Sequence, residues 1–201
     1  MKHGQTPPVQ EIHRYGGVAI AFHWVLALAI LGAFAVGLYL EGQPFSPAKL
    51  KLINWHKWAG VTILALSVLR LLWRLFAGAP APVAGTPRWQ AAIASATHGV
   101  LYLILLAMPL SGWLFHSASG FPPRNLSWFG LFKLPSLSDR DPALRDFALA
   151  AHEWLFIALA VIVTAHALAA LKHHYLDRDR TLARMLPLAK PAPKPEDTPG
   201  A

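Results

Sequence analysis

The chain has 201 residues, of which 55% are hydrophobic and 14% charged, and its mean hydropathy is +0.40. This length fits one domain, and so apolar a composition is typical of membrane proteins. The chain has no cysteine, which excludes disulfides, iron–sulfur clusters and covalent haem attachment through a Cys-x-x-Cys-His motif. Its net charge of +8 comes mainly from basic residues at the ends of apolar stretches, which argues against a nucleic-acid partner.

Four apolar stretches follow in chain order, and each is long enough to cross a bilayer as a helix and so to contact lipid. They cover residues 17–40, 52–76, 92–116 and 148–172, with Gly and Pro clustered near their ends. The sequence therefore predicts an all-α fold, an integral membrane four-helix bundle with up-down topology. We expect three parts, which are an N-terminal cytoplasmic segment without a signal-peptide pattern, a transmembrane domain and a disordered tail rich in Pro, Lys and Ala. These parts are residues 1–16, 17–187 and 188–201.

The basic residues predict the orientation of the bundle. Four spans put both termini on one side, and 11 of the 18 Lys and Arg residues fall on that side against seven on the other. Because cytoplasmic loops carry an excess of Lys and Arg, we expect both termini to be cytoplasmic.

Six histidines lie within the apolar stretches, where ionisable side chains are costly and usually serve a function, and four of them can be matched by depth and face. His152 and His166 are 14 residues apart, which places them on nearly the same helix face about 21 Å apart along the axis. In the predicted topology, His23 shares the inner level with His166, and His56 shares the outer level with His152. Two such pairs suit two bis-histidine haems, while zinc or copper binding, a proton relay and hydrogen-bonded packing remain alternatives.

The residues around these histidines resemble those of the bacterial cytochrome b561 family. The resemblance covers residues 15–187, most of the chain. The segments that carry it are Ala21–Trp24, Asn54–Lys57, Arg70–Arg74, His98–Tyr102, Met108–Gly112, His152–Trp154, His166, Leu171–Tyr175 and Asp177–Pro187.

This resemblance implies a dihaem b-type cytochrome of the bacterial inner membrane, with haem iron held by the same two histidine pairs. It implies electron transfer between an outer-side donor, either superoxide or a periplasmic redox protein, and the quinone pool, with ubiquinone as the expected substrate. Such a protein is an oxidoreductase or an electron-transfer cytochrome. A second interpretation is a haem-bearing membrane anchor that conducts electrons for a respiratory dehydrogenase or hydrogenase. The sequence does not define the oligomeric state.

Further polar residues at the inner level are candidates for cofactor contacts. His98 has no assigned iron, and with His173 or His174 it is a candidate to line a quinone pocket and handle the accompanying proton. The alternative for these histidines is an interface or solvated position. Arg70 and Arg74 are candidates to pair with haem propionates, and snorkelling to lipid headgroups is the alternative.

Charged residues near His56 suggest a route for an anionic donor. Lys49, Lys51 and Lys57 form a predicted positive patch on the outer side, which would steer a small anion such as superoxide. An acidic electron-transfer protein or anionic lipid would suit the same patch. His116 receives no role from the sequence.

Overall fold

The computed structural model describes residues 14–187 apart from residues 84, 123 and 124. Within the described part the chain forms four long helices, which are α1 (Gly17–Glu41), α2 (Pro47–Ala77), α3 (Arg88–Ser119) and α4 (Pro142–Tyr175). Each is long and apolar enough to cross a membrane, which confirms the predicted all-α membrane bundle. The predicted tail and nearly all of the predicted N-terminal segment lie outside the described residues.

Helix ends account for the difference between the predicted stretches and the observed helices. The Ser46 hydroxyl accepts a hydrogen bond from the Lys49 N–H, and Asp141 accepts from the N–H groups of Ala143 and Leu144. Both caps are followed by a proline at the first helical position, which suits the fixed φ of proline. These capped turns extend α2 and α4 beyond their apolar stretches, which is why hydropathy alone predicts them too short.

The helices are apolar on the outside of the bundle as well as the inside. Leu28, Leu103 and Val161 lie in the middle of helices and are 68%, 67% and 62% exposed. In water such a surface would be unfavourable, whereas lipid tails suit it. The buried centre of the bundle is a cluster from all four helices, comprising Leu26, Ile30, Ile63, Ile104 and Leu159.

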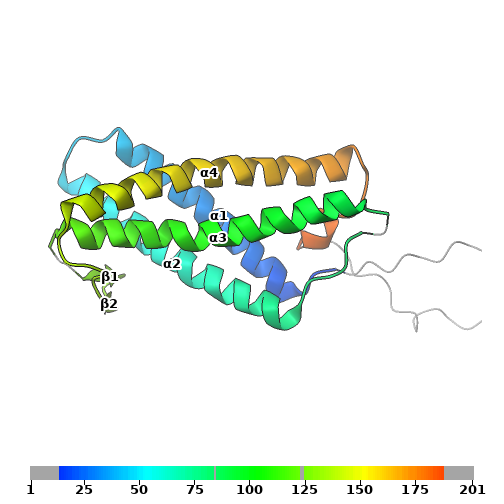
Figure 1. Cartoon of the computed structure of the whole chain (residues 1–201), viewed down its shortest axis with the longest axis horizontal. Coiled ribbons are helices and arrows are strands. Elements are labelled where there is room, and N and C mark those ends of the chain that lie inside the picture. The colour runs from blue at the N-terminus through cyan, green and yellow to red at the C-terminus, as the bar shows by residue number, and fades with distance from the viewer. Residues whose placement is uncertain (1–13, 84, 123–124, 188–201) are drawn as a thin grey trace, which may run out of the picture.

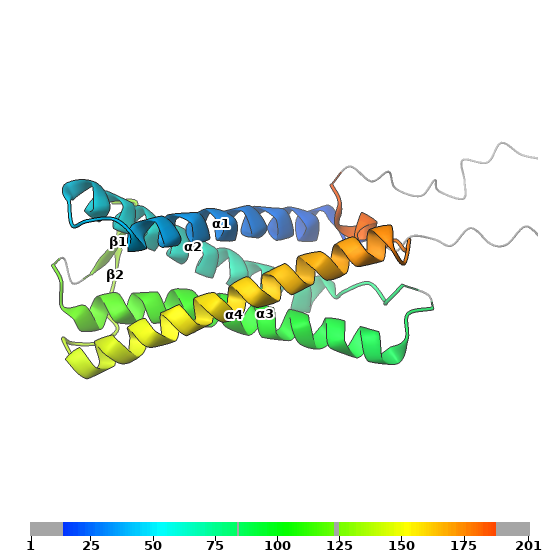
Figure 2. The ribbon, with the colours of Figure 1, turned by 90° about the horizontal axis from the view of Figure 1, so that it is seen from above.

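The arrangement defines two ends of the bundle (Figures 1 and 2). The start of α1 and the end of α4 lie together at one end, called here the terminal end. The opposite end carries a short antiparallel hairpin of β1 (Leu126–Trp128) and β2 (Phe132–Leu134), and is called the hairpin end. An even number of crossings places both described chain ends on the same side, as predicted.

The hairpin is tied to α2 by two indole groups. Trp58 donates its Nε1–H to the Ser127 carbonyl at 2.5 Å, and Trp128 donates to the Thr62 hydroxyl at 3.1 Å. The sequence predicts no strands here. Strands of three residues are too short for a period-two pattern to be read.

The segment after α4, residues 176–187, folds back across the terminal end and is called the C-terminal strap. It includes the short 3₁₀ helix η1 (Ala183–Met185). Trp24 donates its indole N–H to the Met185 carbonyl at 2.7 Å. Arg184 is 9% exposed and donates to the Ala81 carbonyl at 2.8 Å. The strap thus joins α1 and the α2–α3 linker to the end of α4.

Candidate functional site

At the hairpin end, α2 and α4 bring His56 and His152 together. Their ring centroids are 6.3 Å apart, with the ring planes at 80°. Both side chains are partly buried inside the bundle. The depth argument from the sequence paired these two residues, and the structure brings them together.

At the terminal end, α1 and α4 bring His23 and His166 together in the same way. Their ring centroids are 6.2 Å apart, with the ring planes at 66°. One helix, α4, therefore offers a histidine at each of two depths, and a different helix supplies each partner. The two pairs share nearly the same spacing although no residue is common to them.

Both separations fit a metal ion held between two imidazoles. A nitrogen–metal distance of about 2.0 Å, with about 1.1 Å from nitrogen to ring centre, puts the centroids of two axial rings about 6.2 Å apart. Imidazoles packed directly against one another approach more closely, as His98 and His166 do at 5.5 Å. The spacing of the two pairs therefore suits haem iron with histidine on both faces.

Two glycines make room for the histidines at the hairpin end. A Cβ atom on Gly112 of α3 would lie 3.1 Å from Cε1 of His152, which is tighter than ordinary contact. A Cβ on Gly37 of α1 would lie 3.4 Å from Cε1 of His56. The backbones of α1 and α3 thus form the walls of this site.

The hydrogen bonds of His152 suit ligation through its other nitrogen. Its Nδ1 lies 3.0 Å from the Met108 carbonyl, and Ser111 Oγ lies 3.1 Å from the same nitrogen. When Nδ1–H donates to the carbonyl, Nε2 keeps a free lone pair, the state a metal needs. For His56, the buried Nδ1 finds no hydrogen-bond partner among the described residues.

Arg70 of α2 occupies the terminal-end level. Its Nη1 lies 3.1 Å from Nδ1 of His23, and its Nε–H donates to the Tyr102 hydroxyl at 3.2 Å. Because a guanidinium only donates, His23 Nδ1 accepts in this arrangement. Arg74, one turn further along α2, is partly buried in the last turn of that helix. The structure therefore concentrates positive charge beside the terminal-end pair.

His98 of α3 is a third imidazole at the same level. Its ring centroid lies 5.5 Å from that of His166, closer than the two members of either pair. The predicted pair of His23 and His166 has the spacing of two histidines on opposite faces of one iron. The spacing of His98 to His166 is shorter than that arrangement gives, although the structure does place His98 beside the pair.

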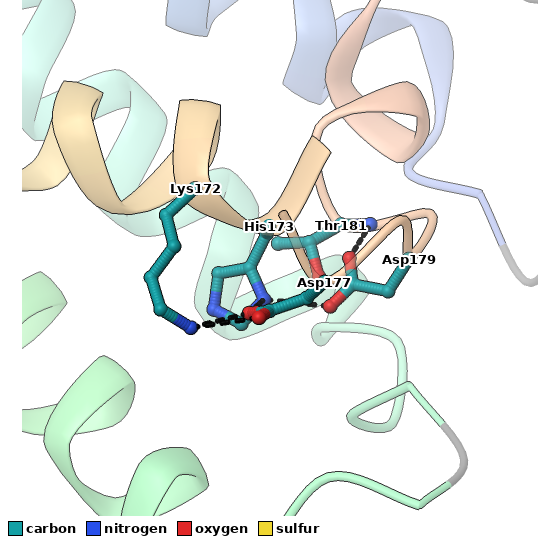
Figure 3. Close-up of polar contacts among 5 residues, drawn as sticks. All are labelled: Lys172, His173, Asp177, Asp179 and Thr181. Carbon is teal, nitrogen blue, oxygen red and sulfur yellow. Dashed lines mark hydrogen bonds and ion pairs between the residues drawn. The ribbon is translucent and has the colours of Figure 1, made fainter. Parts of the chain in front are cut away.

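His173 lies seven residues after His166, on the same face of α4 and about 10 Å nearer the terminal end. Its Nδ1 lies 2.6 Å from an Asp179 oxygen, the short distance expected of a charge-assisted hydrogen bond (Figure 3). Asp179 is held in turn by the Thr181 N–H at 2.8 Å. His173 is therefore fixed between the end of α4 and the C-terminal strap. The adjacent His174 instead packs its ring on Tyr175.

Asp179 is stabilised as a carboxylate by this arrangement. Burial alone raises the pKa of this carboxyl, but hydrogen bonds from Thr181 and His173 outweigh burial and lower the pKa below its ordinary value. His173, Asp177 and Asp179 bring three metal-type ligand groups within 4.8 Å of one another. However, the Lys172 ammonium already bonds to both oxygens of Asp177, at 2.8 and 2.6 Å. The cluster is thus charge-compensated by protein groups.

The three lysines predicted to form one patch at the hairpin end have different surroundings. Lys49 donates to the Gln43 carbonyl at 2.7 Å, and Lys51 is exposed. Lys57 is partly buried, and its Nζ lies 3.1 Å from Nδ1 of His116. Sequence analysis missed His116, which is 7% exposed near the end of α3. Its position within an apolar stretch was the available signal.

Comparison with known proteins agrees with this architecture. Residues 14–188 match the family described as prokaryotic cytochrome b561. Cytochrome b561 homolog 2 of Escherichia coli K12 is 37% identical over 174 residues, which cover 86% of this chain and 91% of that protein. Cytochrome b561 homolog 1 of the same organism is 30% identical over 184 residues, covering 89% and 100%. A probable superoxide oxidase, CybB of Yersinia pestis, is 31% identical over 180 residues, covering 87% and 96%.

The fold and the site together define a class, a multi-pass membrane protein with histidine pairs at two depths of a four-helix bundle. Within that class, the chain belongs to the prokaryotic cytochrome b561 family of membrane electron-transfer proteins. Membership implies a haem b cofactor. The resemblance noted in the sequence is thereby confirmed at the level of the family.

Proposed function

We propose that this protein is a dihaem b-type cytochrome of the bacterial inner membrane, which transfers electrons between an outer-side donor and the quinone pool. The observation that carries the proposal is the pair of histidine separations, 6.2 Å at the terminal end and 6.3 Å at the hairpin end. Each matches the spacing of two axial imidazoles, and the residues lie at different depths. Both termini face the cytoplasm in this proposal, so the hairpin end is the outer side.

His56 and His152 hold one haem b, and His23 and His166 hold the other. Haem held on both faces by histidine supplies one-electron transfer with no open coordination position. His152 is oriented by its Nδ1–H bond to the Met108 carbonyl. Gly37 and Gly112 keep space for the imidazoles, so packing against their backbones helps to position the rings. The domain that does this is residues 17–187, with residues 1–16 and 188–201 as flanking segments.

Arg70 and Arg74 bind the propionates of the terminal-end haem. Arg70 now donates to Nδ1 of His23, which places the ring proton of a neutral imidazole on Nε2. Ligation through Nε2 would need the opposite tautomer, in which Nδ1 carries the proton and cannot accept a hydrogen bond from Arg70. A carboxylate is the natural new partner for a guanidinium, because two parallel N–H groups match its two oxygens.

The terminal end also carries the polar groups that quinone reduction needs. His98 beside His166, and His173 two turns away, line the proposed quinone site. Reduction of a quinone consumes protons, and imidazole transfers them near neutral pH. Asp179 accepts a hydrogen bond from His173 Nδ1, which leaves Nε2 of His173 as the nitrogen that exchanges a proton with the quinone. Ubiquinone is the expected acceptor.

Superoxide is the donor that we favour at the hairpin end. The relative from Yersinia pestis, 31% identical over nearly its whole length, is named as a probable superoxide oxidase. Lys49 and exposed Lys51 begin α2 on this side, and positive charge there raises the encounter rate of a small anion. A periplasmic redox protein is the alternative donor, and it would use the same charge.

The test is electron transfer in proteoliposomes that contain ubiquinone. Superoxide generated outside the vesicles should reduce the haems within the mixing time and then the quinone, with a rate that falls as salt rises. A matched His56→Ala preparation should lose this reaction. If superoxide leaves the haems oxidised while a large soluble dehydrogenase co-purifies and reduces them, the protein is the electron-conducting anchor of that enzyme instead.

A further inference from the structure

Lys57 and His116 form a cationic pair inside the hairpin end. The Lys57 Nζ lies 3.1 Å from Nδ1 of His116, which joins α2 to α3. Because an ammonium only donates, His116 Nδ1 accepts and the imidazole is neutral in this arrangement. His116 is 7% exposed, and Lys57 is partly buried. His116 therefore lies inside the bundle, and Lys57 is partly shielded from solvent.

This pair lies close to the hairpin-end histidines. Lys57 directly follows His56 in the chain. His116 is four residues after Gly112, the residue whose α carbon faces the His152 ring, so it lies on the same face of α3 one turn nearer the hairpin end. The pair thus borders the proposed haem site on the side away from the membrane centre.

The following loop covers this region. The Leu137 N–H donates to Ser117 Oγ at 3.0 Å, and the Asp141 N–H donates to the Ala118 carbonyl at 3.0 Å. Ser117 and Ala118, next to His116, are 2% and 1% exposed. This contact shields the His116 side of the pair from solvent, whereas a group that belongs to a cofactor in the bundle would approach from inside.

Lys57 has a charge without a counter-charge. Among the described residues, no carboxylate lies within ion-pair distance of its ammonium. A partly buried cation whose hydrogen-bond partner is a neutral imidazole is costly, because desolvation is not offset by an opposite charge. A carboxylate that enters this space would remove that cost and bond to the remaining N–H groups.

We propose that Lys57 and His116 form a carboxylate-binding site for a propionate of the hairpin-end haem, with Lys57 as the binding group and His116 as the positioning residue. The inference rests on the proposed dihaem function. In this proposal Lys57 binds a haem propionate, whereas Lys49 and Lys51 remain available to attract a soluble anion. Each haem level then has its own cation from α2, since Arg70 serves the other.

The experiment uses the complete dihaem protein, purified with haem that carries isotope-labelled propionate carboxyl groups. Reduced-minus-oxidised infrared spectra identify the labelled carboxylate bands, and a redox titration gives the potential of each haem. Lys57→Met is the main variant. Lys51→Met, an exposed lysine of the same helix, is the matched control. Lys57→Arg retains the charge if Lys57→Met proves unstable.

In Lys57→Met we expect the labelled bands to shift, and the potential of the hairpin-end haem alone to fall, because a nearby cation disfavours the more positive oxidised state. Haem loss from that site should be about ten-fold faster, the factor expected for one charge-assisted bond. His116→Leu should produce a smaller shift of the same sign, and His116→Gln, which keeps an acceptor, should restore the wild-type bands. In carboxylate bands, haem potential and rate of haem loss, Lys51→Met and Lys57→Arg should resemble the wild type.

Unchanged carboxylate bands and an unchanged potential in Lys57→Met would overturn the proposal. A slower reaction with superoxide together with unchanged bands would also overturn it, because the pair would then serve the soluble anion. A wild-type protein with fewer than two haems is a different failure, that of the proposed function itself, and the haem content of the starting preparation reveals it before any variant is made.

Discussion

The two ends of the bundle use the same pair of residue types in different surroundings. At the terminal end, the pair of His23 and His166 lies beside a third imidazole and two arginines. At the hairpin end, His56 and His152 each lie against a glycine backbone, His152 also contacts a carbonyl oxygen, and the loop after α3 packs on the end of that helix. Equal spacing within the pairs suits both ends to the same kind of cofactor in the proposed function. The different surroundings suit proton transfer coupled to electron transfer at the terminal end, and electron transfer alone at the hairpin end.

Removing a ligand should have the largest effect and should separate the two ends. We expect His152→Ala to lose the hairpin-end haem and His166→Ala to lose the terminal-end haem, each leaving one haem per chain, because an iron with one axial histidine is held weakly. Haem extraction and the visible spectrum of each purified variant measure this.

His98→Ala is the control for that prediction, because the ring spacing places His98 outside the terminal-end pair. It should keep both haems. If His98→Ala loses a haem while His23→Ala keeps two, the pairing at the terminal end is wrong.

Substitution of Gly112, whose backbone faces the His152 ring, should have the next largest effect on haem binding, and only at the hairpin end. In Gly112→Ala, the new Cβ would lie 3.1 Å from Cε1 of His152, so that the ring must move. A cost of about 1–3 kcal/mol is typical of such overpacking, and haem binding at this end should weaken about ten-fold or more. Gly99→Ala on the same helix is the matched control, since nothing lies within 4 Å of its Cβ. Equal haem retention in Gly112→Ala and Gly99→Ala would argue against a haem site in which His152 packs on the backbone of Gly112.

The C-terminal strap should respond to acid through Asp179. Its carboxyl has a pKa lowered from the ordinary 3.8, so the ionised form stabilises the folded strap. This contribution is present above pH 3.8 and is lost as the pH falls through the lowered value. Protease sensitivity of residues 176–187, measured against pH, should therefore rise at the acid end, and Asp179→Asn should lose that dependence. A strap equally pH-dependent in the variant would show that another group titrates.

The smallest effect is expected at the hairpin. Trp128→Phe removes one indole N–H bond to Thr62 and keeps most of the apolar contact, at a cost of about 1 kcal/mol. Thermal unfolding should shift by a few degrees, with both haem spectra unchanged. A loss of the hairpin-end haem in this variant would mean that the hairpin forms part of the cofactor site.

The sequence predicted the parts of this molecule that depend on depth in the membrane. The spans follow from hydropathy, and the 14-residue spacing of His152 and His166 predicted two levels and both pairings. The contact between Lys57 and His116 was not predicted, because hydropathy gives the level of a residue and not the direction in which it faces. The bond from His173 to Asp179 arises from a reversal of the chain after α4, which no helical period describes.

The most direct test of the account is the number of haems per chain in the purified wild-type protein, taken with its reduced-minus-oxidised visible spectrum. The account predicts two non-covalent haems b with the low-spin spectrum of bis-histidine iron. One haem, none, or a spectrum of iron with an open coordination position would contradict it and return the paired histidines to packing, a proton relay or another metal.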